Sequence, residues 1–423
     1  MKHLNIDISS LTPKTHTLSN GRPIYLFPDN NLEIVELDFA FNAGSCFESK
    51  RLAASVATKM LTLGTKHHTA EEIAEFLDFR GIQIELSSYV YSAVVSVFTL
   101  EKYIPELLPL LYEFFDEPTF PQDEIDLFLS RKRQMLRTSM QKTKYLARNL
   151  FYESLFGFEH PMGTYTLEKD FDIIQREDAI SFFNQHFTLS DAILVMSGGF
   201  KERDLELYNQ YFGHTEASPF LKWNRNPYPL HTDYSARHQV MPQAVQSSIR
   251  IGALLPFQKD STEFAQFQVL NTLLGGYFGS RLMQNIREDK GYTYGINSTT
   301  QHDLYNCSFF IQTDVEGSIT QDAVREIYHE LDRLCHEPIP TEELDTVKQS
   351  MSGTFLRTID GVFDRAERFL HSLLVESIQE VSTPLLLQTI ETVTPAQLQA
   401  IAQQVFDKEH LLEIIVGSDT IEK

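Results

Sequence analysis

The chain has 423 residues, 42% of them hydrophobic, and its 58 acidic and 36 basic residues leave a formal net charge of −22 at pH 7. This composition indicates a folded protein of two or three domains with a sizeable core. Nucleic acids and anionic membrane surfaces are bound by an excess of Lys and Arg, so the charge argues against both as partners. The three cysteines fit neither a disulfide framework nor a cysteine zinc site, and they indicate a reducing compartment: Cys46, Cys307 and Cys335.

The N-terminal residues reach Asp7 before any apolar stretch, and no run of about 18 apolar residues occurs further on. We therefore expect a cytoplasmic protein.

The first clear strand lies at residues 35–41, where four apolar residues alternate with Glu36, Asp38 and Ala40. This period of two predicts a half-buried strand whose second face is wet or lightly covered.

The next element is a helix from Thr69 to Arg80, with a capping box formed by Thr69 and Glu72 and a stop at Gly81. Because the cap explains this segment, we do not take the preceding His67 and His68 as metal ligands. Further helical patterns run through four segments: 104–115, 124–156, 264–274 and 342–369. Half-buried strands interleaved with helices favour an α+β fold, with mostly antiparallel sheets and helices on one sheet face.

The helical pattern of residues 124–156 contains a basic stretch without acids between Arg131 and Arg148. Its cations are Arg131, Lys132, Arg133, Arg137, Lys142, Lys144 and Arg148. In a chain of net charge −22 this stretch is interpreted either as a solvated helix face or as a docking surface for an acidic partner or peptide.

Two pairs of segments indicate an internal duplication. Residues 116–126 and 336–345 are both proline-bounded turns entering acid-rich helices, with Glu117 and Glu337 separated by 220 positions. Phe187 and Phe406 each end a helix before an apolar strand and a glycine, and they are 219 positions apart. Two independent pairs of segments are thus separated by nearly the same number of residues, which predicts two similar tandem domains.

The join between the repeats is expected where periodicity fails and Pro, Asn and aromatic residues crowd together. We accordingly predict an N-terminal domain at 1–212, a linker at 213–230 and a C-terminal domain at 231–423.

No local motif for nucleophilic catalysis occurs in the sequence. There is no GxSxG elbow, and LGGYFGSR at 274–281 lacks the frame of a phosphate-binding loop. We interpret its glycines as shaping a tight entry into the next helix, which Ser280 would cap, Leu282, Met283 and Ile286 would anchor in the core, and Gly291 would end.

Several segments resemble the pitrilysin/insulinase family of metallopeptidases. They are NAGSCFES at 42–49, MLTLGTK at 60–66, TAEEIAEFL at 69–77, LFGFEHPMG at 155–163, and the stretch from GSRL at 279 to IREDKGYTY ending at 294. These segments span both repeats. The resemblance implies tandem α+β domains that form half of a clam-shell, which agrees with the duplication.

Active members of that family carry an H-x-x-E-H zinc motif on a helix, in which two histidines one turn apart bind zinc and the glutamate acts as base. The resemblance places Ser55 and Lys59 at the histidine positions and Thr58 at the glutamate position. A lysine ammonium offers no lone pair and repels a cation. The family's third ligand, a glutamate, would fall at 134–138, where no acid occurs, so we expect this chain to bind no catalytic zinc.

The family also places an arginine and a tyrosine seven positions apart in a later domain, facing the zinc across a chamber. Arg287 and Tyr294 have that spacing here. A guanidinium and a phenol that converge on a cleft can bind a peptide carbonyl or carboxylate. We therefore expect both residues to bind peptide substrate, with Tyr294 returning beside the helical turn that holds Arg287.

The resemblance thus predicts a non-catalytic, substrate-binding subunit of a heterodimeric zinc peptidase, inactive alone, with no cofactor of its own. A related zinc-bearing chain would supply the metal and base, and a homodimer is possible in isolation. The alternative is a structural or scaffolding pseudopeptidase with no role in proteolysis, which would have no use for Arg287 and Tyr294.

Overall fold

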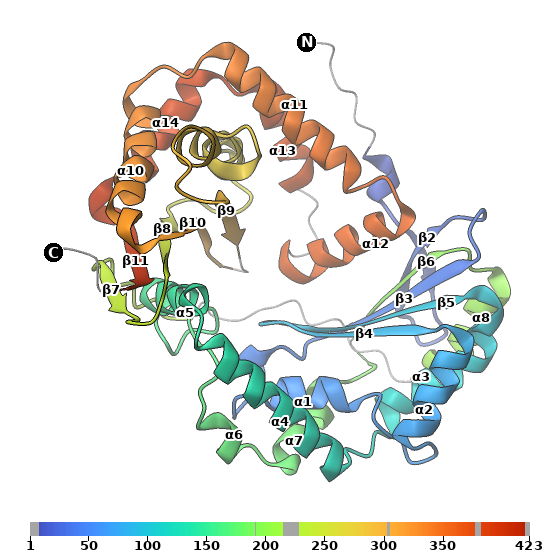
Figure 1. Ribbon diagram of the computed structural model, residues 1–423. Coiled ribbons are helices and arrows are strands. Elements are labelled where there is room, and N and C mark those ends of the chain that lie inside the picture. The colour runs from blue at the N-terminus through green and yellow to red at the C-terminus, as the bar shows by residue number, and fades with distance from the viewer. Residues whose placement is uncertain (1–7, 191, 215–227, 303–304, 377–381, 419–423) are drawn as a thin grey trace.

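The computed structural model describes residues 8–190, 192–214, 228–302, 305–376 and 382–418. It contains two sheets, each backed by helices of its own half of the chain (Figure 1). The first sheet has the strand order β1-β2-β6-β3-β5-β4 and the second β7-β11-β8-β10-β9. Neighbouring strands are antiparallel except for the parallel pairs β2/β6 and β7/β11.

In the first half the strands are β1 (Lys14–Thr17), β2 (Pro23–Pro28), β3 (Ile34–Phe41), β4 (Gln83–Ser88), β5 (Ala93–Leu100) and β6 (Ile193–Gly198). Its helices are α1 (Ala53–Met60), α2 (Ala70–Arg80), α3 (Ile104–Asp116), α4 (Gln122–Ser139), α5 (Thr143–Phe156), α6 (Asp170–Ile173), α7 (Arg176–His186) and α8 (Glu202–Phe212).

In the second half the strands are β7 (Arg237–Val240), β8 (Gln246–Leu255), β9 (Ile296–His302), β10 (Cys307–Glu316) and β11 (Leu412–Gly417). Its helices are α9 (Thr262–Asn271), α10 (Thr320–His336), α11 (Thr341–Arg357), α12 (Val362–His371), α13 (Ser382–Thr392) and α14 (Pro395–Val405), with π-helical segments η4 (Thr272–Gly276), η5 (Met283–Asp289) and η7 (Ser372–Glu376).

The predicted duplication and α+β class are confirmed. The five strands β2-β6-β3-β5-β4 have the same order and directions as β7-β11-β8-β10-β9. Helix α2 also follows the sequence prediction, because Thr69 and Glu72 form the capping box and Gly81 ends the helix with a φ of 63°. The domain limits remain a prediction, and most of the predicted linker, residues 215–227, lies outside the described residues.

Two long helical patterns are each divided into two helices, contrary to the prediction. The pattern at 124–156 breaks between Ser139 and Thr143, and the pattern at 342–369 breaks between Arg357 and Val362. Each break lets the second helix turn away from its own repeat and pack on the sheet of the other, so tertiary packing overrides local periodicity. The basic stretch 131–148 is consequently not one helix but spans the break between α4 and α5.

The two redirected helices exchange places between the repeats (Figure 1). Helix α5 packs on β8 and β11 of the second sheet through Ala147, Phe151 and Leu155. Helix α12 packs on β2 and β6 of the first sheet through Ala366 and Leu370, and η7 continues this stripe at Leu374. Within each stripe the three residues follow one another at intervals of four positions. Each residue of the α5 stripe corresponds to the residue of the second stripe that lies 219 positions later in the sequence. Each repeat therefore completes the other's core.

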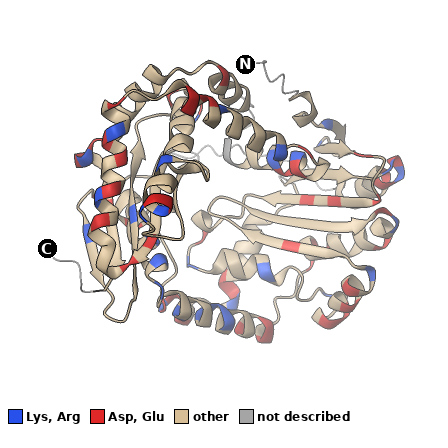
Figure 2. Cartoon of the chain, turned by 45° about the horizontal axis from the view of Figure 1, so that its top comes forward, with Lys and Arg blue, Asp and Glu red and all other residues tan. Residues whose placement is uncertain are grey.

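The expectation that one face of β3 is wet or lightly covered is wrong. Glu36 and Asp38 are 7% and 3% exposed, because α12 covers the sheet on this side. Acidic positions lie in the middle of strands of the first sheet (Figure 2). Ser197 donates a hydrogen bond to Glu36, and Ser96 donates one to Asp38. Burial raises the pKa of Glu36 to about 8 and also raises the pKa of Asp38.

This burial predicts a pH dependence of stability. The nearby Asp38 on its own strand, Glu367 on α12 and Glu85 on β4 raise the pKa of Glu36 further. The folded chain thus holds this proton more tightly than the unfolded chain, between the ordinary value of 4.5 and about 8. The free energy of unfolding should therefore fall as the pH rises through this range.

We expect E36Q to flatten that fall, since glutamine accepts the same hydrogen bond and does not titrate. Urea denaturation of both proteins at several pH values between 5 and 8 measures the difference. Glu75→Gln, on the exposed face of α2, is the matched control and should behave as the unmodified chain does. If the free energy of unfolding of E36Q fell equally steeply with pH, Glu36 would not be the group responsible for the pH dependence.

Candidate functional site

The positions that the resemblance assigns to the zinc motif lie on α1. Glu48 accepts a hydrogen bond from the N–H of Ala54 at 3.1 Å and so caps the start of the helix. The Ser55 hydroxyl donates to the carbonyl of Leu52 at 3.1 Å, and the buried Thr58 hydroxyl donates to the carbonyl of Ala54 at 2.8 Å. Lys59 is exposed. These three side chains are unsuited to hold zinc.

A half-buried acid and a half-buried base lie beside α1. Burial raises the pKa of Glu48 to about 7, and it lowers the pKa of Lys132 on α4, a helix that packs on α1. The third-ligand positions 134–138 also lie on α4. Within the described ranges, no three His, Cys, Asp or Glu side chains lie close enough together to hold a metal ion. The residues here do not fit the family's metal.

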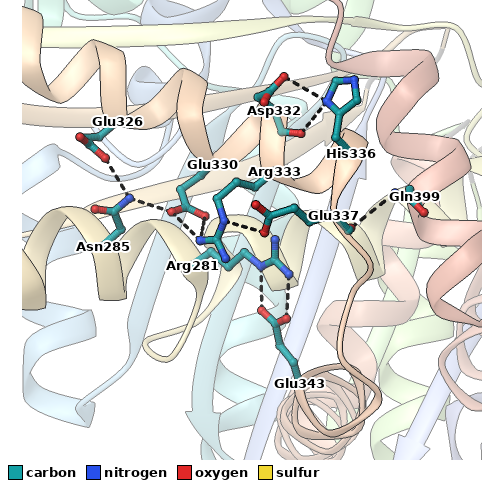
Figure 3. Close-up of polar contacts among 10 residues, drawn as sticks. All are labelled: Arg281, Asn285, Glu326, Glu330, Asp332, Arg333, His336, Glu337, Glu343 and Gln399. Carbon is teal, nitrogen blue, oxygen red and sulfur yellow. Dashed lines mark hydrogen bonds and ion pairs between the residues drawn. The ribbon is translucent and has the colours of Figure 1, made fainter.

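The segment that carries Arg287 is held from one side by an ion-pair network (Figure 3). Both Nε and Nη2 of Arg281 contact the Glu343 carboxylate of α11 at 2.8 Å. Asn285 donates to Glu330 at 2.7 Å and to Glu326 at 3.2 Å, both on α10. These residues line a cavity of about 490 Å³. Because acids and bases in it pair with one another, we interpret the network as an anchor that fixes η5 against α10 and α11.

The ends of this helical segment agree only in part with the prediction. Leu282, Met283 and Ile286 are buried as expected, and Gly291, with a φ of 66°, ends the segment. The Ser280 side chain does not cap it, however. Its hydroxyl is buried and has no hydrogen-bond partner among the residues described, while its carbonyl accepts from Gln284.

Arg287 lies at the surface with an aromatic neighbour that the sequence did not single out. Its guanidinium carbon lies 4.9 Å from the centre of the Phe278 ring, and its Nε lies 3.5 Å from Glu288. Phe278 is 65% exposed. The glycines of residues 274–281 predict only a tight helix entry; the signal for Phe278 in the sequence is its place between two glycines of that turn.

Tyr294 is 94% exposed and lies two residues before the edge strand β9. The chain does return to the end of η5, since Tyr292 donates its N–H to the carbonyl of Ile286 at 3.0 Å. No contact between Tyr294 and Arg287 is recorded in the described part of the chain. The structure thus places both predicted residues at the surface, on either side of one turn, without joining them.

Part of the basic stretch at residues 131–148 is paired with acidic residues of the same chain. Arg133 and Arg137 form ion pairs with Glu168, and Arg133 pairs with Asp172 as well. His67 and His68 likewise contact Glu117 and Glu113. Of the basic stretch, Lys144 and Arg148 lie on α5, beside the second sheet.

Comparison with known proteins gives matches in both halves. A sequence model of the insulinase family, peptidase family M16, matches residues 26–156, and a second, described as the peptidase M16 inactive domain, matches residues 174–351. The non-peptidase homolog YmxG of Helicobacter pylori is 24% identical, over 83% of this chain and 81% of its own. An uncharacterized zinc protease YmxG of Bacillus subtilis is 22% identical, over 96% of this chain and 98% of its own.

Solved structures share the fold. A peptidase M16 inactive domain from Pseudomonas fluorescens has a TM-score of 0.83 at 20% identity, covering 97% of this chain and 99% of its own. A protease from Helicobacter pylori has a TM-score of 0.80 at 18% identity, covering 96% and 100%. No helix in the described ranges is long and apolar enough to cross a membrane.

The relatives carry two kinds of description, zinc protease and non-peptidase homolog. In this chain the resemblance puts Ser55, Thr58 and Lys59 at the three motif positions. The two matched regions, the duplicated topology and the similarity to M16 structures agree. The chain therefore belongs to peptidase family M16, the insulinase family.

Proposed function

We propose that this chain is the non-catalytic, peptide-binding subunit of a heterodimeric zinc peptidase. The observation that carries the proposal is the combination of a motif helix unsuited to metal with a half-exposed guanidinium and two exposed aromatic rings on the other repeat. Phe278 and Tyr294 are exposed large aromatic residues, and such residues mark interaction sites when they gather together. Arg287 would bind a peptide carbonyl or carboxylate, and the Tyr294 phenol would donate to the reacting carbonyl at the partner's zinc.

The first test is metal content and activity of the chain alone. We expect less than stoichiometric zinc by elemental analysis and no peptide cleavage, because Ser55 and Thr58 use their hydroxyls within the helix and Lys59 repels a cation. The variant Lys59→His should gain no activity, since the other ligands and the base are still missing. Near one zinc per chain, removed by a chelator together with activity, would overturn the proposal.

A second test is assembly. Co-expression with a related chain that retains H-x-x-E-H should yield a stable heterodimer by size exclusion with light scattering. We expect the two repeats to form half of a clam-shell that the partner completes. If both chains stayed monomeric at high concentration, this result would count against the pairing. A homodimer of this chain alone would not be evidence for the heterodimer.

The third test is steady-state kinetics of the assembled pair. Tyr294→Phe removes one hydroxyl donor from the transition state, so kcat should fall about 10²- to 10³-fold. Arg287→Ala removes an anchor used in the ground and transition states alike, so it should raise KM more than it lowers kcat. Because both side chains are at least one-third exposed, thermal melts should change little.

Arg325→Ala is a useful control, since Arg325 is an exposed arginine on α10 that pairs with Asp322 rather than with the anchoring network. Unchanged turnover of both site variants, in a pair that still assembles, would favour the scaffolding alternative instead.

A further inference from the structure

A small cavity of about 50 Å³ lies between the exchanged helix α5 and the second sheet. Its polar lining comes from Lys144 on α5, from Ser248 and Arg250 on β8, from Asn297 on β9, and from Gln312 and Asp314 on β10. A site of this size holds a group of a few heavy atoms, somewhat more than one water molecule.

Arg250 gives this cavity an unusual charge. The residue is 6% exposed, and its Nη2 donates to Gln312 at 2.7 Å. Its Nη1 is buried and has no acceptor among the described residues. The rings of Phe310, Tyr152 and Phe151 surround the guanidinium, with the centre of the Phe310 ring 4.2 Å away. These rings compensate part of its desolvation, but a buried guanidinium still favours an anion nearby.

The other charges around the cavity leave it positive. Lys144 is exposed at its edge. Burial lowers the pKa of the Arg250 guanidinium and Arg148 lowers it further, while Tyr152 and Asp314 act in the opposite direction. In the described ranges, none of these three cations forms an ion pair. Asp314 is the carboxylate in the lining, and the Ser248 hydroxyl donates to it. The cavity therefore carries a local excess of positive charge in a chain of net charge −22.

The cavity adjoins the proposed peptide-binding residues. Gly295, the residue after Tyr294, lines it, and its carbonyl is fixed by the Thr313 hydroxyl at 3.0 Å. Asn297, also in the lining, belongs to the edge strand β9. The cavity is therefore lined by the residue that directly follows Tyr294 in the chain.

We propose that the cavity binds the free α-carboxylate at the C-terminus of a peptide held at Arg287 and Tyr294. A terminus suits a site this small, because no chain needs to continue past it. Charge-assisted hydrogen bonds from guanidinium and ammonium groups are the ordinary means of binding a carboxylate. This inference rests on the proposed function, and it adds a preference for short peptides or fragments with a free end.

The test uses two pools of fluorescein-labelled decapeptides without Asp or Glu, one with a C-terminal carboxylate and one with a C-terminal amide. Fluorescence anisotropy with the purified full-length chain, and with the assembled pair, gives the ratio of the two affinities. We expect the carboxylate form to bind about tenfold more tightly, as one charge-assisted contact would give. Lys144→Gln should reduce this ratio severalfold without weakening the amide form.

Lys144 is chosen because it is exposed, whereas substitution of the buried Arg250 endangers folding. Lys142→Gln is the matched control, since Lys142 is an exposed lysine at the start of the same helix but outside the lining. A ratio near one in the unmodified chain and pair, or equal loss in both lysine variants, would overturn the proposal. So would an amidated peptide with one internal Glu that binds as tightly as the free acid, since a side chain would then be the ligand.

The same measurement separates the two proposals. If Arg287→Ala weakens both peptide forms equally while their affinities never differ, peptide binding stands and the carboxylate site fails. If Arg287→Ala changes nothing while the Lys144-dependent difference persists, the carboxylate site stands and the role of Arg287 fails.

Discussion

The exchange of α5 and α12 between the repeats is the packing constraint on which the rest of the structure depends. Each sheet has its own helices on one face, and its other face would lie open without a helix from the other half of the chain. Because Ala147, Phe151 and Leu155 have the same spacing as Ala366, Leu370 and Leu374, the two contacts are versions of one interaction. Neither repeat completes its core alone, so the halves are expected to unfold together rather than as separate domains.

The same exchange positions the candidate sites. Because α5 lies on the second sheet, cations from the first repeat stand beside Arg250 and within reach of the loop that carries Tyr294. The ion pair of Arg281 with Glu343 and the hydrogen bonds of Asn285 to α10 hold the Arg287 segment from the opposite side. The proposed peptide-binding surface is thus supported by a rigid sheet, an exchanged helix and an anchored turn, while its own side chains remain exposed.

Local signals in the sequence predicted what depends on local chemistry. The cap at Thr69 and the stop at Gly81 could both be predicted from neighbouring residues, whereas the loss of ligands at Ser55 and Lys59 is implied by the family resemblance. The breaks near Ser139 and Gly361 could not, because no strong helix breaker marks the first and both are imposed by packing on a distant sheet. The burial of Glu36 and the neighbours of Arg250 follow from the same long-range contact and were missed with it.

The two repeats use equivalent buried positions in opposite ways. Asp38 pairs with Ser96 and Val195 across the first sheet, and Arg250 pairs with Gln312 and Ile414 at the corresponding ladder position of the second. Burial of Asp38 is tolerable because a carboxyl can take a proton, as its raised pKa indicates. A guanidinium does not lose its charge at any ordinary pH. The second repeat must therefore accommodate a permanent charge where the first carries a carboxyl that can be protonated, and this asymmetry is the physical basis for the anion binding proposed at the cavity beneath α5.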